Sequence, residues 1–263
     1  MVLSFIGTGN MGGALARAAS LNRNNRLLLA NRHPDKAQQL ADLIGGTVCD
    51  NLQAVTDADY VFLGVKPQML EEMLQDVREA FQTRKSSFTV VSMVAGRTIA
   101  QIQEKIGCNA PVIRILPNTP VAVGEGMILY VCSDEVTQEM EQGFLEAMAG
   151  AGRFSKIEER LADICSVVGG CGPAYAAMFL ESMADGGVAC GMPRIQAMEV
   201  AAQMMLGTAK LMLESHAHPG VMKDAVCSPG GSTIQGVRTL EERAFRASII
   251  DAVIASYEKT LRF

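Results

Sequence analysis

The sequence predicts an α/β protein with two domains: a doubly wound, mostly parallel sheet at the N-terminus and an all-α domain at the C-terminus. Over residues 1–155, short apolar runs alternate with helical segments, a pattern typical of parallel strands covered by helices on both faces. From residue 156 to 263, apolar residues recur at helical spacing and hardly a strand candidate remains. We therefore expect the domain boundary between residues 155 and 156.

The individual elements follow from these runs. Strands are expected where nearly every residue is apolar, because a parallel strand is buried on both faces. The expected strands cover residues 2–6, 26–30, 60–64, 88–92, 112–116 and 126–131, and the helices between them residues 14–19, 35–44, 68–81, 98–106 and 135–148. In the second domain we expect helices over residues 159–167, 173–189, 195–214 and 241–260.

Composition excludes several classes of function. The chain has 49 % hydrophobic and 19 % charged residues and a net charge of −5, which describes a soluble protein and argues against a general nucleic-acid binder. The seven cysteines never occur at Cys-x-x-Cys spacing and form no ligand pattern with histidine, so we expect no metal site. Scattered cysteines and the lack of a leader-like start predict a cytoplasmic protein. The apolar stretch 174–188 carries Glu181 and Asp185 and is too short for a bilayer span.

The first strand leads into the motif Gly7-x-Gly9-x-x-Gly12 and then into a helix. In this context Gly7 permits the turn, Gly9 lets the backbone approach a pyrophosphate, and Gly12 lets the helix pack close to the sheet. The amides and positive dipole end of the helix bind phosphates. The pattern favours a Rossmann-type dinucleotide site over the alternative, a merely structural turn.

The residues after the second strand distinguish the two nicotinamide cofactors. NAD sites usually have an Asp or Glu here, whereas this chain has Asn31-Arg32. A carboxylate would repel a 2′-phosphate, while amide and guanidinium groups bind one. We predict NADP, with NADPH preferred and NADH possible. The alternative for Arg32 is a solvated loop charge.

Loops that follow other strands are candidates for positioning a ligand, because open α/β sheets bind ligands at the carboxyl ends of their strands. Lys66 follows one strand and Asn118 another, and the Asn118 amide could meet the nicotinamide or the substrate. For both residues the alternative is a helix cap or an exposed loop side chain. The loops are 64–68, 94–96 and 116–120.

A second candidate site lies in the helical domain. The turn Ser228-Pro229-Gly230-Gly231 precedes Ser232-Thr233 and a helical run, and consecutive amides at a helix N-terminus form a nest for a carboxylate or phosphate. A simple N-cap is the alternative, but it would explain one hydroxyl and not three hydroxyls with two glycines.

The helices of the second domain are rich in methionine and alanine and are apolar around most of their circumference. A helix that is apolar on most sides must be covered. We infer that a second subunit covers them, with coverage by the first domain alone as the alternative.

These segments together resemble the Δ1-pyrroline-5-carboxylate reductase family, whose members carry out the last step of proline biosynthesis. The matching motifs are Phe5 to Gly12, Val65 to Gln68, Arg114 to Pro120, Gly172 to Tyr175, and His218-Pro219-Gly220 through Ile234. The resemblance implies a Rossmann-type domain followed by a helical domain that forms an intertwined homodimer or a multiple of dimers. Two departures stand out: Cys171 occupies a position where members often have serine, and His216 a position where some have glutamate.

The resemblance also implies a role for each matching residue. Ile6, Gly7, Thr8, Gly9, Asn10 and Met11 would hold the pyrophosphate, Asn31 and Arg32 the ribose phosphate, and Asn51, Gly64, Val65, Lys66, Pro67, Met93, Val94 and Ala95 the rest of the cofactor. Ser228, Gly230, Gly231 and Ser232 would bind the substrate carboxylate, with Asn118 as a further substrate contact. Thr233 would be the catalytic residue, because its hydroxyl can hydrogen-bond the imine nitrogen while hydride reaches the ring. The alternatives are a non-catalytic NADP-binding regulatory protein and a β-hydroxyacid-type dehydrogenase, which would use a helical-domain lysine such as Lys210 or Lys223.

Overall fold

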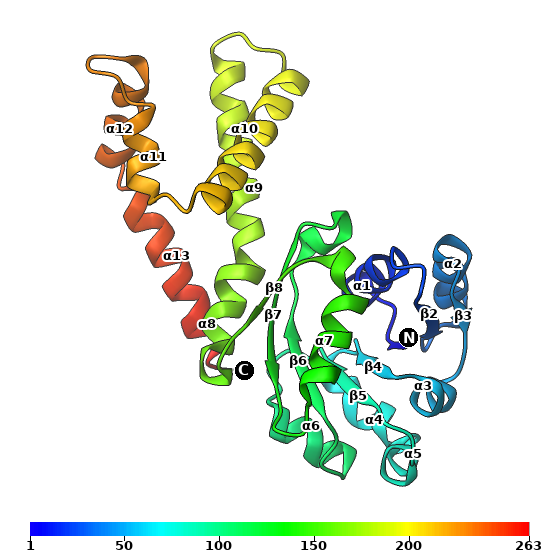
Figure 1. The fold of residues 1–263 in the computed structure, drawn as a ribbon. Helices are drawn as coiled ribbons and strands as arrows, with labels where there is room; N and C mark the ends of the chain where they lie inside the picture. Colours follow the sequence, from blue (N-terminus) through cyan, green and yellow to red (C-terminus); the bar gives the residue numbers. More distant parts are fainter. Residues whose placement is uncertain (263) are drawn as a thin grey trace. The chain divides into compact units, whose positions relative to one another are not determined.

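The computed structural model describes residues 1–262, and these form two compact units (Figure 1). The first unit is Met1–Gly170 together with the last residues of the chain, and the second is Cys171–Lys259. The division therefore lies later than the expected boundary, which falls inside the last strand, Gly152–Lys156.

The first unit is built on one eight-stranded sheet with the strand order β3-β2-β1-β4-β5-β6-β7-β8. All neighbouring strands are parallel except β6 and β7, which confirms the predicted mostly parallel, doubly wound sheet. The strands are β1 Val2–Ile6, β2 Arg26–Ala30, β3 Thr47–Val48, β4 Tyr60–Leu63, β5 Thr89–Ser92, β6 Val112–Leu116, β7 Gly126–Cys132 and β8 Gly152–Lys156.

Two hydrophobic cores lie on opposite faces of this sheet. Phe5 and Phe62 stack with ring centroids 4.4 Å apart in one core, which also holds Phe144. Leu63 and Phe81 belong to the other. The helices α1 Asn10–Ser20, α2 Pro34–Ile44 and α7 Gln138–Ala147 supply the first core, and α3 Asn51–Asp57, α4 Leu70–Gln75, α5 Arg78–Thr83 and α6 Ile99–Ile106 supply the second.

Three features of this unit differ from the prediction. The helix expected over residues 68–81 is interrupted: Pro67–Met69 is a 3-10 turn, and Val77 has φ −123° and ψ 0° between α4 and α5. Leu70, Leu74, Val77 and Phe81 are all buried, so the break lets both short helices pack into one core. The strands β3 and β8 and the helix α3 were not predicted. The side chain of Asp50 caps α3 by accepting a hydrogen bond from Gln53 N at 2.7 Å.

The second unit is helical, as predicted. Its helices are α9 Gly172–Ala189, α10 Arg194–Ser215, α11 Pro219–Ala225, α12 Ser232–Glu242 and α13 Phe245–Thr260. The helix expected over residues 241–260 begins only at Phe245, because Ala244 has the left-handed φ of 57° and separates it from α12. The hydroxyl of Tyr175 lies 2.5 Å from Ser256 Oγ, which links α9 to α13.

Few side chains of the second unit are buried within one chain. In α9 only Ala184 is buried, and in α10 only Ala197 and Ala201, while Ile195 is 84 % exposed and Met178 67 % exposed. The helical stretch Glu159–Ala189 passes a length and composition test for a membrane span, so it is longer than the sequence suggested. A long apolar helix covered by another protein surface has the same length and composition.

Candidate active site

The carboxyl ends of β1, β2 and β4 border a pocket of about 530 Å³ in the first unit. This is the edge at which open parallel sheets bind ligands, next to the point where the strand order reverses at β1 and β4. The pocket is lined by Ile6, Gly7, Gly9, Asn31, Arg32, Pro34, Asp50, Asn51, Gly64, Val65, Lys66, Met69, Glu72, Met73 and Asp76.

The glycine turn forms the part of the pocket between β1 and α1. Gly7 has φ 97°, and a Cβ there would lie 2.7 Å from Gly64 O. A Cβ on Gly12 would overlap Gly7 O, so this helix approaches the turn as the motif predicts. Beside Gly9, in contrast, no atom lies within 4 Å of an ideal Cβ position. Backbone at Gly9 therefore faces open space in a wall of the pocket.

The start of α1 suits an anion. Gly9 is the N-cap and offers no side-chain hydrogen bond to the first amides of the helix, which leaves those amides for a ligand. Thr8, between the two pocket glycines, is 8 % exposed, and its buried Oγ1 has no hydrogen-bond partner among residues 1–262. These features fit the pyrophosphate of a dinucleotide.

Charged side chains of both signs surround the pocket. Arg32 and Lys66 contribute positive charge, and Asp50, Glu72 and Asp76 contribute negative charge. Arg32 is exposed and makes no ion pair with any residue from 1 to 262, so its guanidinium is available to a phosphate. Next to Asp50, burial and then the Asp50 and Asp57 carboxylates raise the pKa of the Cys49 thiol to about 11.

The pocket brings together most of the cofactor residues predicted from the sequence. Ile6, Gly7, Gly9, Asn31, Arg32, Asn51, Gly64, Val65 and Lys66 line it, whereas Thr8, Asn10, Met11, Pro67, Met93, Val94 and Ala95 are not lining residues. Met69, Glu72, Met73 and Asp76 line it as well and were missed. Their i, i+3, i+4, i+7 spacing was a signal for one helical face.

The side chain of Asn118 forms hydrogen bonds within the first unit. Its Oδ1 accepts a hydrogen bond from Met127 N at 2.9 Å, and its Nδ2 donates one to Gly169 O at 3.1 Å. The side chain thereby connects the loop after β6 to β7 and to the segment before α9. Asn118 does not line the 530 Å³ pocket, and its predicted contact with a ligand stays a prediction.

The turn predicted to bind a carboxylate lies before α12 in the second unit. Gly230 has φ 71°, and Gly231 N donates to Ser228 O at 3.0 Å. The N-cap is Gly231, without a side-chain cap, so the alternative of a Ser or Thr N-cap is not the arrangement observed. Thr233 is exposed.

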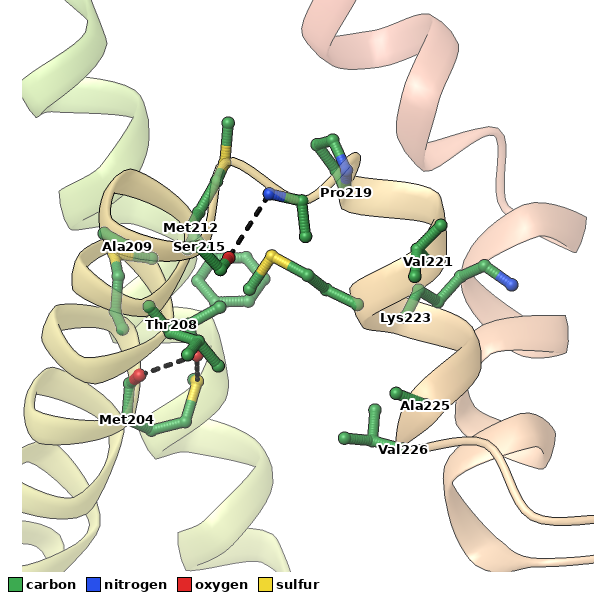
Figure 2. A pocket seen from close by; sticks show the side chains of 15 residues that line it. Met204, Thr208, Ala209, Met212, Ser215, Pro219, Val221, Lys223, Ala225 and Val226 are labelled. Atoms are coloured by element: carbon green, nitrogen blue, oxygen red, sulfur yellow. Dashed lines mark hydrogen bonds between the residues drawn. The ribbon is translucent and has the colours of Figure 1, made fainter.

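An apolar groove of about 760 Å³ occupies another part of the second unit. Figure 2 shows Met204 and Met212 of α10 on one side of it and Val226, at the end of α11, on the other. Thr208 in this wall donates to the backbone oxygen of Met204 at 2.9 Å, which satisfies its hydroxyl within the helix. The residues that line the groove are mainly apolar and include Phe179, Met205, Leu211, Ala217, Pro219 and Met222.

No cluster of three or more His, Cys, Asp or Glu side chains with metal-binding geometry occurs among the described residues. All seven cysteines are free thiols.

Comparison with known proteins matches both parts of the chain. Residues 159–262 match the family model for pyrroline-5-carboxylate reductase dimerisation, and residues 2–96 match the model for NADP oxidoreductase, coenzyme F420-dependent. The chain is 38 % identical over 262 residues to the pyrroline-5-carboxylate reductase of Escherichia coli, covering 98 % of this chain and 96 % of that protein.

Solved structures agree with this match. A pyrroline-5-carboxylate reductase from Coxiella burnetii superposes with a TM-score of 0.90 at 26 % identity, covering 99 % of this chain and 97 % of the other. The pyrroline carboxylate reductase of Plasmodium falciparum, solved with NADP bound, has a TM-score of 0.86 at 26 % identity with the same coverage.

Proposed function

The chain belongs to the pyrroline-5-carboxylate reductase family, and from this premise we propose that it reduces Δ1-pyrroline-5-carboxylate to L-proline with NADPH. The observation that carries the proposal is the match over nearly the full chain, which includes the helical part as well as the nucleotide-binding part. We assign NADP binding to the first unit, and substrate binding and self-association to the second.

In the first domain the chain binds and orients the cofactor, which supplies a hydride when bound. The pyrophosphate lies against the open backbone at Gly9 and accepts hydrogen bonds from the first amides of α1. Asn31 and Arg32 bind the 2′-phosphate, for which a guanidinium is well suited. The remaining predicted contacts come from Asn51 and the loops after β4 and β5.

In the second domain the turn before α12 binds the substrate carboxylate. The amide of Gly230 and the hydroxyls of Ser228 and Ser232 are donors for it, and the helix dipole favours the negative charge. Gly231 shapes the turn, because its amide donates to Ser228 O. The hydroxyl of Thr233 donates a hydrogen bond to the ring nitrogen. This hydrogen bond stabilises the negative charge that develops on the nitrogen as hydride adds to the neighbouring ring carbon, and one proton from solvent completes the amine.

The alternative of a β-hydroxyacid-type dehydrogenase is not favoured. Such an enzyme needs a lysine that exchanges a proton near neutral pH. The hydrogen bond from Lys223 to Asp224 raises the pKa of that lysine, and Lys210 lies 3.8 Å from Glu214 on the surface of α10. The alternative of a non-catalytic NADP-binding protein does not account for the three hydroxyls of the turn before α12.

Self-association follows from the second unit. Its exposed apolar helices and the groove of Figure 2 correspond to the region that matches the dimerisation model. We assign this surface to a second copy of the chain, in a homodimer or a multiple of dimers, and not to a lipid bilayer. The seven free thiols are in keeping with a reducing cytoplasm.

The test is loss of NADPH absorbance at 340 nm with pyrroline-5-carboxylate as the substrate. Thr233→Ala should lower kcat by about 100-fold, as expected for removing one transition-state donor, and should leave the Kd of NADP⁺ unchanged. Thr233→Ser, which keeps the hydroxyl, should restore most of the activity. Absence of turnover by the wild-type protein at any pH would rule out the reductase, and weaker NADP⁺ binding by Thr233→Ala would contradict the role of Thr233.

A further inference from the structure

One wall of the cofactor pocket is a single face of α4 and its flanking turn. Met69, Glu72, Met73 and Asp76 all line the pocket, and residues at this spacing lie on the same side of a helix. Met69 is the N-cap of α4 and Asp76 its C-cap. The wall therefore alternates two thioethers with two carboxylates.

The two methionines form an apolar surface for a flat group. Met73 is 7 % exposed and packs in the core beside Leu70 and Leu74, so its position is fixed. Met69 is half-buried. Thioethers make favourable contacts with aromatic rings, and the adenine of NADP is an aromatic ring with apolar faces.

The two carboxylates need an explanation, because the cofactor is an anion. Their neighbour Glu71 pairs with Lys105 and Arg78, whereas neither Glu72 nor Asp76 forms an ion pair with any residue between 1 and 262. A phosphate would be repelled by this wall and attracted to Arg32 and the glycine turn. A part of the cofactor that binds to this wall is therefore one that offers hydrogen-bond donors and carries no phosphate. The base of the adenosine end fits, because Asn31 and Arg32, assigned to the 2′-phosphate of that end, line the same pocket.

The exocyclic amino group supplies the only donors on the adenine ring. An ionised carboxylate only accepts hydrogen bonds, and Asp and Glu accept from base amino groups in the same way in nucleic-acid recognition. We propose that Glu72 and Asp76 accept hydrogen bonds from the adenine amino group while Met69 and Met73 support the ring, so that this wall selects an aminated base. The inference rests on the proposed function, which places NADP in this pocket.

The test compares two ligands of equal charge by isothermal titration calorimetry: NADP⁺ and 1,N6-etheno-NADP⁺, in which a fused ring replaces both amino hydrogens. The wild-type protein should bind NADP⁺ about tenfold more tightly, the equivalent of one charge-assisted hydrogen bond. In the double variant Glu72→Leu/Asp76→Ala, which leaves no side-chain acceptor at these two positions, this preference should fall to less than about threefold. Because both ligands carry the same charge, removing two negative charges from the pocket changes both Kd values by the same factor. The ratio of the two Kd values therefore reports only on the amino group.

Glu79→Gln in α5 is the matched control, since Glu79 is exposed and lies outside the pocket; it should keep the wild-type preference. An equal preference in wild type and double variant would overturn the role of the carboxylates and leave the proposed function intact. Failure of the wild-type protein to bind NADP⁺ at all would overturn both.

Discussion

Replacing Gly9 with alanine should separate cofactor binding from folding. Gly9 has φ −71° and ψ −166°, an extended conformation that alanine adopts readily, and no atom lies within 4 Å of the added Cβ. The free energy of unfolding should therefore change by less than about 1 kcal/mol. The new methyl group would occupy the space in which the pyrophosphate approaches the backbone.

The cost to binding follows from overpacking. Adding one carbon to a well-packed contact costs about 1–3 kcal/mol, which corresponds to a rise of about 5- to 150-fold in the Kd of NADP⁺. Calorimetric titration with NADP⁺ measures this rise, and urea unfolding of the free protein measures the stability.

Two other glycines provide the comparison. Gly7→Ala should be clearly destabilised, because φ is 97° and the Cβ would lie 2.7 Å from Gly64 O. Gly13 lies inside α1, and its added Cβ would make only an ordinary contact, 3.5 Å from Thr8 O. The free energy of unfolding of Gly13→Ala should therefore rise by about 0.5–1 kcal/mol, and the variant should bind NADP⁺ as the wild type does. The reasoning is refuted if Gly9→Ala unfolds as easily as Gly7→Ala, or if it binds NADP⁺ as the wild type does.

Three further predictions concern charge. Arg32→Ala should lower the preference for NADPH over NADH in kcat/KM by about tenfold or more, and an unchanged ratio would remove Arg32 from the phosphate site. Arg114 has a side chain 6 % exposed and lies 3.1 Å from Glu159. Asp163 lies 3.9 Å from the same guanidinium and Glu159 is 35 % exposed, so Glu159→Leu should lower the free energy of unfolding by about 2–3 kcal/mol, less than for a fully buried pair. Arg114→Met/Glu159→Leu should recover part of this in urea unfolding but not the bond that Ile99 N donates to Glu159; no recovery would contradict the ion-pair argument. The pKa of Cys49 is raised from 9.0 to about 11, so the protonated thiol stabilises the fold fully below pH 9, and this contribution is lost as the pH rises through about 11. Between pH 8 and pH 10.5 the free energy of unfolding should fall more in the wild type than in Cys49→Ala. An equal fall in both proteins would contradict a raised pKa of Cys49.

Local sequence patterns were sufficient to predict much of the fold. The motif from Gly7 to Gly12, with a strand before it and a helix after it, predicted the first strand, the first helix and the edge of the sheet at which the pocket lies. Nearly continuous apolar runs predicted the central strands, because burial on both faces leaves few polar positions. The absence of such runs predicted the helical second unit.

Features that depend on distant partners were not predictable in this way. The break at Val77 has no glycine or proline to mark it and follows from packing of Leu70 and Phe81 into one core. The hydrogen bond that Asn118 Nδ2 donates to Gly169 O, 51 residues away, could not be read from the local motif, and the predicted ligand contact of Asn118 stays a prediction. The strand β8 has exposed Arg153 and Lys156 and therefore lacks the apolar run that marks the central strands.

The close approach of Gly7, Gly12 and Gly64 restricts how this family can vary. A Cβ on Gly12 or on Gly64 would collide with Gly7 O, and a Cβ on Gly7 would collide with Gly64 O. In most cores a larger side chain at one position can be compensated by a smaller one opposite. Here each collision is with backbone, and no partner has a side chain left to shrink. Substitution at any of the three positions therefore cannot be compensated at the other two, although the three glycines lie in different segments: after β1, in α1 and after β4.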